Sequence, residues 1–148
     1  MIRPIQIDQA EQVAALWNAN CQEACACSLA NEELANVVRL LGVSVDCAQA
    51  WCFVAIEDGA IVGFITFVLR PDPRGLGAPA GEIEELYVQP EMRGRGIAKQ
   101  LVDKAVATLR LEGVSVIRGS ADRDATQAHA FWSKLGWEND MTLFALYP

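Results

Sequence analysis

The sequence has almost no histidine, and its cysteines do not form a usual metal-binding pattern. A single histidine, His129, stands among 148 residues, and the spacing C-x3-C-x-C of Cys21, Cys25 and Cys27 is not typical of zinc sites. We therefore expect no metal site. Five is an odd number of cysteines, and no secretory signal precedes them, which argues against a disulfide framework. We interpret the cysteines as small buried apolar side chains.

Long apolar runs and basic clusters are also missing. No apolar run approaches the roughly 20 residues that span a bilayer, and the first residues lack the basic and apolar regions of a signal peptide. The sequence therefore predicts a soluble, cytoplasmic protein. The net charge is −7, with no basic block to neutralise a phosphate backbone, so nucleic acid is a poor candidate partner. The excess acid suits a cationic substrate such as an amine.

What the sequence does contain is enough apolar material for one folded domain over residues 1–148. Hydrophobic residues make up 52% of the chain, enough for a core of ordinary size. Apolar residues at helical spacing predict one helix that opens near Asp8 and a second that follows Asn31 and ends at Gly42. A short strand is expected before the first of them.

The rest of the chain predicts strands and helices that build a mixed sheet. Two β-type runs, 51–56 and 60–69, flank Asp58-Gly59, a dipeptide typical of hairpin turns. After a loop rich in proline and glycine at 70–81, including Pro73, strands and helices are expected at 82–88, 96–111, 114–118, 126–135 and 141–146. The order β-α-α-β-β-β-α-β-α-β indicates the α/β (α+β) class, with helices on both faces of the sheet. The 82–118 crossover should be parallel and right-handed.

The turn at Arg93-Gly94-Arg95-Gly96 is the clearest candidate binding site. The first N–H groups of a helix have no intrahelical acceptor, and the macrodipole places about half a positive charge there. Glycines let the backbone bend tightly and approach a ligand closely. These features suit an anion such as a pyrophosphate. The alternative is a simple turn with solvated arginines, but the strand before it and the amphipathic helix after it favour the anion site.

Three motifs resemble the GNAT superfamily of N-acetyltransferases. Residues 93–98 (R-x-x-G-x-A) match its Q/R-x-x-G-x-G/A pattern, residues 86–90 (L-Y-V-x-P) resemble its strand and bulge, and residues 128–137 (A-x-x-F-W-x-x-x-G-W) are similar to its A-x-x-F-Y-x-x-x-G-F helix. The resemblance implies the GNAT fold, in which a largely antiparallel mixed sheet splays at its fourth strand and carries helices on both faces.

The resemblance also implies acetyl-CoA, or a related acyl-CoA, as the acyl donor. Its pyrophosphate would be held by the backbone N–H groups of Arg93, Gly94, Arg95, Gly96, Ile97 and Ala98. Its pantetheine arm would pair like an extra strand beside Leu86, Tyr87 and Val88. The N–H of Val88 would face the thioester oxygen, and a donor aimed at developing oxyanion charge can lower the barrier by ~3 kcal/mol.

By the same resemblance, a primary amine attacks the thioester directly, without a covalent enzyme intermediate. A base must then take the proton of the ammonium, often through water. Glu82 stands where several family members keep a glutamate base. Glu84 shares its face by strand alternation, and Glu85 lies on the other face. We rank them in the order Glu82, Glu84, Glu85, against the alternative of a solvated acidic strand edge.

Two positions depart from the family pattern. Trp132 replaces a tyrosine that often protonates the leaving thiolate, and an indole N–H does not titrate in this range. His129, one helical turn earlier, is a candidate substitute; the alternative is a partly exposed structural histidine. Ala125 replaces an asparagine that often contacts the cofactor.

Three functions follow as hypotheses. The first is an N-acetyltransferase of a small, cationic amine. The second is acetylation of protein N-termini or lysines. The third, motivated by Trp132 and Ala125, is an acyl-CoA-binding module that has lost catalysis. The family resemblance also makes a homodimer plausible.

Overall fold

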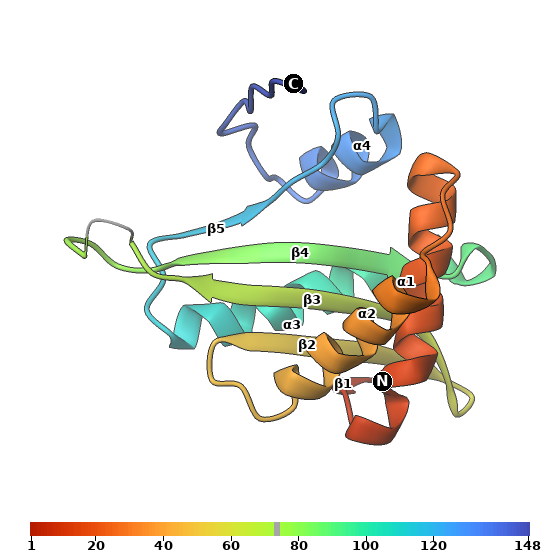
Figure 1. Ribbon diagram of the computed structural model, residues 1–148. Helices are drawn as coiled ribbons and strands as arrows, with labels where there is room; N and C mark the ends of the chain where they lie inside the picture. The colour runs from red at the N-terminus through yellow and green to blue at the C-terminus, as the bar shows by residue number, and fades with distance from the viewer. Residues whose placement is uncertain (73–74) are drawn as a thin grey trace.

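The computed structural model describes residues 1–72 and 75–148, and its centre is a five-stranded mixed sheet (Figure 1). The strands are neighbours in chain order, and each pair is antiparallel except β4 and β5, which are parallel. Their bounds are β1 Ile2–Pro4, β2 Ala50–Glu57, β3 Ala60–Arg70, β4 Ala80–Val88 and β5 Val116–Gly119. The sheet confirms the predicted fold class and the parallel pairing across the crossover.

Helices cover both faces of this sheet, as the element order predicts. The helices are α1 Ala10–Cys25, α2 Asn31–Ser44, α3 Ile97–Leu111 and α4 Thr126–Lys134, with short 3-10 turns η1 Ile7–Gln9 and η2 Pro90–Met92. In Figure 1, α1 and α2 lie in front of the sheet and α3 lies behind it. Val13 and Leu41 pack with Phe64 on the α1–α2 face, whereas Leu101 packs with Phe67 on the α3 face.

Local signals placed the element ends well, with one difference. The β2–β3 turn has positive φ at both Asp58 (49°) and Gly59 (80°), the geometry expected of this dipeptide. The helix α2, however, continues through Gly42 to Ser44. A glycine inside a helix costs only about 1 kcal/mol, and burial of Leu41 (2% exposed) stabilises this turn. The predicted loop 70–81 includes Pro73, which lies outside the described residues.

The strand predicted at 141–146 is not formed. Residues 138–148 lie outside the sheet, and the apolar side chains of Leu143, Phe144 and Leu146 are more than 80% exposed. The segment is held near the sheet where Arg118 Nε of β5 donates to Asp140 Oδ2 (2.9 Å). The prediction was wrong because composition measures how well a segment would suit a strand, whereas a strand also needs a neighbour with which to form hydrogen bonds.

The cysteines are only partly the buried side chains expected. Cys52 is buried, and burial raises the pKa of its thiol to about 12. Cys25 and Cys27 are exposed where α1 ends, which corrects the interpretation for these two. Within residues 1–72 and 75–148, no cluster of three or more His, Cys, Asp or Glu side chains is arranged to hold a metal ion. No helix in these ranges is long and apolar enough to cross a membrane.

Truncation of Leu101 should show how much the α3 face contributes to stability. Leu101 is 0% exposed, so Leu101→Ala removes buried methyl groups and leaves a cavity. We expect a loss of about 3 kcal/mol in the free energy of unfolding, measured by urea denaturation. The same substitution at Leu40, which is 58% exposed on α2, should change it by less than about 0.5 kcal/mol. Equal losses at both positions would contradict this account of the core.

Candidate active site

The end of β4 has an open edge on the side of β5. Pairing of β4 with β5 stops at Ile83 and Gly119, and Figure 1 shows β5 diverging from β4 beyond that point. On the other side, the Gln89 N–H donates to Val62 O (2.9 Å), and Val88 stands opposite Gly63. Main-chain groups of successive residues in a strand point to opposite edges. Those of Val88 therefore point to the open edge.

The close approach of β3 to this strand end depends on a glycine. A Cβ at Gly63 would lie 2.7 Å from the carbonyl oxygen of Tyr87 and 3.1 Å from a methyl group of Val88. Contacts between a Cβ and backbone as short as 2.7 Å do not occur without a shift of one chain. Residue 63 thus sets the separation of the two strands beside Val88.

The turn after β4 presents a row of unused backbone donors. Gly94 and Gly96 have φ of 75° and 79°, and Gly96 is the residue that caps α3. In the described part of the chain, no N–H from Gly94 to Ala98 donates to another backbone group, and the first helical bond runs from the Gln100 N–H to Gly96 O (3.0 Å). Such a concave array of N–H groups at a helix start suits an anion.

Arg93 does not belong to this row of donors. Its backbone N–H donates to Pro90 O (3.2 Å), so the free donors begin at Gly94. Its guanidinium donates to Val88 O (2.8 Å) and to both carboxylate oxygens of Glu23 (3.0 and 2.7 Å). The charge of Arg93 is therefore paired with a carboxylate of α1 and does not face the anion site unpaired. Arg95 is exposed, and its guanidinium makes one long bond, to Glu91 O (3.4 Å).

Tyr87 turns its side chain away from the open edge and toward α1. It is 5% exposed, and its hydroxyl donates to Glu23 Oε1 (2.8 Å). Burial, reinforced by the neighbouring Glu23 carboxylate, raises the pKa of the Tyr87 phenol to about 12. Alternation places the main chain of Leu86, like that of Val88, toward the open edge. Leu86 and Val88 can therefore offer backbone groups to a ligand there, whereas the Tyr87 side chain cannot.

Two of the three predicted carboxylates share one arginine. Arg70 Nε donates to Glu82 Oε2 and Arg70 Nη2 to Glu84 Oε1, both at 2.9 Å. Their common partner confirms that Glu82 and Glu84 lie on one side of β4. Burial raises the pKa of Glu84, Arg70 opposes that shift, and Glu82 adds to it.

Glu85 lies on the same face as Glu82, which corrects the prediction that it points the other way. Thr66 pairs with Glu85 and Val68 with Glu82. Thr66 and Val68 are two residues apart and share a face, so their partners share it too. The reason is a bulge between Thr66 and Phe67 that inserts one extra residue into β4. Simple alternation fails across such a bulge.

The surroundings of Glu85 differ from those of its neighbours. It is half-buried against α1, where Asn20 Nδ2 donates to its Oε2 (2.9 Å), and its N–H donates to Thr66 Oγ1 (3.1 Å). Burial raises the pKa of Glu85 most; the Asn20 hydrogen bond lowers it, and the nearby charge of Glu84 raises it. In the described part of the chain no arginine or lysine pairs with Glu85.

The helix α4 holds the two positions considered for a general acid. His129 is exposed, and its Nε2 lies 2.8 Å from Asp122 O in the segment that precedes the same helix. Trp132 packs on Trp137 (ring centroids 4.6 Å apart), and a Cβ at Gly119 would lie 3.0 Å from its ring. Trp132 is thus a packing residue under β5. An acid role for His129 stays a prediction.

Sequence reasoning missed Asn20 and Glu23, which bring α1 into the site. The signal was present: with Leu16 they form the spacing i, i+4, i+7, which places all three on one helix face. Leu16 is 9% exposed, so this face is turned to the sheet. Arg70, the common partner of Glu82 and Glu84, was missed as well.

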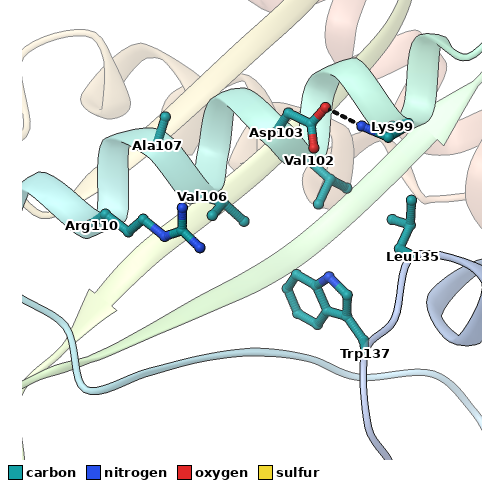
Figure 2. A pocket seen from close by; sticks show the side chains of 8 residues that line it. All are labelled: Lys99, Val102, Asp103, Val106, Ala107, Arg110, Leu135 and Trp137. Atoms are coloured by element: carbon teal, nitrogen blue, oxygen red, sulfur yellow. Dashed lines mark hydrogen bonds and ion pairs between the residues drawn. The ribbon is translucent and has the colours of Figure 1, made fainter.

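A cavity of about 360 Å³ lies along α3, next to the turn (Figure 2). Lys99, in the first turn of α3, lines it and forms an ion pair with Asp103 (2.6 Å). Val106 and Arg110 continue the lining along α3, and Leu135 and Trp137 close it from the segment after α4. The sequence did not predict this cavity, because Leu135 and Trp137 join α3 only through the tertiary fold.

Comparison with known proteins finds a family model that matches most of the chain. The model of the "Acetyltransferase (GNAT) family" matches residues 17–137. A mycothiol acetyltransferase of Thermobispora bispora is 31% identical over 85 residues, which cover 57% of this chain and 29% of that protein. An aminoglycoside N(6′)-acetyltransferase type 1 of Stenotrophomonas maltophilia is 33% identical over 94 residues, 62% of this chain and 61% of that protein. The chain thus spans less than two thirds of these relatives.

Solved structures share the whole fold at low identity. A transcriptional regulator from Bacillus halodurans C-125 superposes with a TM-score of 0.84 at 20% identity, covering 99% of this chain and 98% of that one. The aminoglycoside N-acetyltransferase AAC(6′)-Iy in complex with CoA has a TM-score of 0.83 at 19% identity, covering 100% and 93%. At these identities the likeness shows the fold.

Proposed function

The chain belongs to the acetyltransferase (GNAT) family, and from this premise we propose that it transfers an acetyl group from acetyl-CoA to a primary amine of a small, cationic acceptor. The amine nitrogen attacks the thioester carbon directly. The C–N bond forms, the C–S bond breaks, the thiolate of CoA leaves, and the nitrogen's proton passes to a base. The observation that carries this proposal is the row of free N–H groups at 94–98, together with the N–H of Val88 at the open edge of β4.

The N–H donors of the turn and those of β4 would bind different parts of the cofactor. The N–H groups from Gly94 to Ala98 would hold the pyrophosphate, and Arg95, exposed on the same turn, would add positive charge. The main-chain groups of Leu86 and Val88 at the open edge of β4 would pair with the pantetheine arm. The N–H of Val88 would then meet the thioester oxygen, where charge develops during attack.

A carboxylate without a paired cation supports a cationic amine as the acceptor. Among the described residues no arginine or lysine pairs with Glu85, which accepts a hydrogen bond from Asn20 of α1, whereas Glu23 is paired with Arg93. A relative that is named for acetylation of aminoglycoside nitrogens supports an amine acceptor. The cytoplasmic location and the homodimer expected from the sequence stay predictions.

We propose Glu85 as the general base, in place of the order inferred from the sequence. A useful base needs a pKa raised toward the working pH. The pKa of Glu85 is raised mainly by burial, and no cation among the described residues opposes it. Glu82 and Glu84, by contrast, each form an ion pair with Arg70, and this cation opposes the rise that burial causes in the pKa of Glu84. Glu85 would take the proton directly or through one water.

Incubation with acetyl-CoA and a panel of amines tests the proposal. We expect release of free CoA thiol with small polyamines and aminosugars, and little release with neutral alcohols of the same size. Peptides with free N-termini or lysines form the second arm of the panel. Turnover on peptides alone would contradict the small-molecule acceptor. Binding of CoA by calorimetry without turnover on any amine would contradict catalysis and favour an acyl-CoA-binding module.

A further inference from the structure

We propose that Glu23 and Arg93 form a positioning pair that fixes the end of β4 against α1, and that the Arg93 side chain does not bind the cofactor's pyrophosphate. This inference rests on the proposed function, since it assigns roles within the same site. It concerns how the site is held in shape. Neither residue touches the reacting atoms.

The first observation is where Arg93 Nε donates its hydrogen bond. Its acceptor is the carbonyl oxygen of Val88, at 2.8 Å. The N–H and C=O of one residue in an antiparallel strand point to the same edge. Arg93 therefore binds the carbonyl of the residue whose N–H is to meet the thioester oxygen. A shift of this guanidinium would rotate the main chain of Val88, and its N–H would then no longer point to the thioester oxygen.

The second observation is that Glu23 holds the guanidinium in place. Its carboxylate accepts hydrogen bonds from Arg93 Nη2 (2.7 and 3.0 Å) and from the Tyr87 hydroxyl (2.8 Å). The guanidinium also lies over the Tyr87 ring, 5.4 Å from its centroid. Burial opposes ionisation of Glu23, but the hydrogen bonds from Arg93 and Tyr87 lower its pKa overall. The charge of Arg93 is thus paired with a carboxylate of the protein itself.

The third observation is the place of Glu23 on α1. Asn20, one turn earlier on the same helix face, donates to Glu85. Two residues of α1 therefore position groups that we assign to the reaction. Asn20 holds Glu85, the proposed base, and Glu23 holds Arg93, which in turn binds the main chain of Val88. Both members of the ion pair are 42% exposed, and ion pairs this exposed add little to stability. Their contribution is to geometry.

The experiment compares Arg93→Gln and Glu23→Gln, singly and together, with Arg95→Gln as the matched control on the same turn. We expect each of the first two to lower kcat about tenfold or more, because small misplacements of reacting groups are costly, while the Kd for CoA changes less than about twofold. The double variant should fall no further than the worse single variant, since both remove one interaction. Arg95→Gln should weaken CoA binding, which is the opposite of the pattern expected for Arg93→Gln.

A readout that needs no substrate is amide hydrogen exchange in the segment 86–89. It should become faster in Arg93→Gln and Glu23→Gln and stay as in the parent in Arg95→Gln. A tenfold weaker Kd for CoA with unchanged kcat in Arg93→Gln would show that Arg93 binds the pyrophosphate and would overturn the inference. Additive losses in the double variant, or unchanged exchange, would overturn it too. If the parent neither binds CoA nor turns over, the proposed function fails, whereas an active parent with unaffected variants refutes this pair alone.

Discussion

Replacement of Gly96 by proline should abolish binding of CoA. Gly96 caps α3 with φ of 79°, whereas proline is locked near −65°. The turn would have to rebuild, and the N–H groups of Ile97 and Ala98 would leave their positions. A hydrogen bond to a charged group contributes about 1.5–3 kcal/mol. Loss of two such bonds should raise the Kd by about two orders of magnitude or more, as measured by isothermal calorimetry.

Gly113→Pro is the matched control for this prediction. Gly113 follows the opposite end of α3 with φ of 72°, and nothing lies within 4 Å of a Cβ there. The substitution imposes similar backbone strain far from the turn, so CoA should bind as it does to the parent. If Gly96→Pro binds CoA like the parent, the turn does not hold the pyrophosphate. If both variants lose binding and circular dichroism shows unfolding, Gly96→Ala becomes the decisive variant, with a loss of binding expected.

Replacement of Glu85 by glutamine should lower kcat by about 10²–10⁴-fold, the usual contribution of a general base. The parent's kcat should rise with pH through the raised pKa of Glu85, because only the ionised carboxylate accepts a proton. The variant should lose this limb of the pH profile.

The free energy of unfolding should fall over the pH range in which kcat rises. The folded protein holds the Glu85 proton to higher pH than the unfolded chain does, because burial raises the folded pKa. Folding stability therefore falls as pH rises through that window, above the ordinary pKa of a glutamate. Glutamine carries no charge to bury, so Glu85→Gln should be at least as stable as the parent at pH 7 in urea denaturation. A variant that is both inactive and unfolded would contradict this account.

Glu82→Gln and Glu84→Gln are the controls for the choice of base. Each removes one acceptor of Arg70 at an exposed site, where ion pairs contribute little. We expect kcat to fall less than about threefold in either. A larger loss of kcat in one of them than in Glu85→Gln would show that this residue is the base, in agreement with the order inferred from the sequence.

The features that the sequence predicted well are those set by local chemistry. The Asp58-Gly59 hairpin, the long helix after Gly96 and the strand before the turn each depend on neighbouring residues only, and all three form. The fold class followed from the order of elements and from the family resemblance. The free donors at 94–98 followed from a glycine-rich turn that opens a helix.

The features that were predicted wrongly depend on distant partners. The face of Glu85 was wrong because the bulge opposite Thr66 is a property of the β3–β4 pair. The pairing of Arg93 with Glu23 joins residues 70 positions apart, so no local pattern indicates it. The segment 141–146 has strand-like composition but lies unpaired outside the sheet.

Gly63 constrains the reaction although it would touch neither substrate. Any larger residue there would press on the Tyr87 carbonyl and the Val88 methyl group, and so on the strand end that is to carry the thioester. A randomised library at this codon, selected for acetyl transfer, should return glycine almost alone, although the residue offers no functional group. The shape of the reaction centre thus depends in part on the absence of a side chain at residue 63 of the neighbouring strand β3.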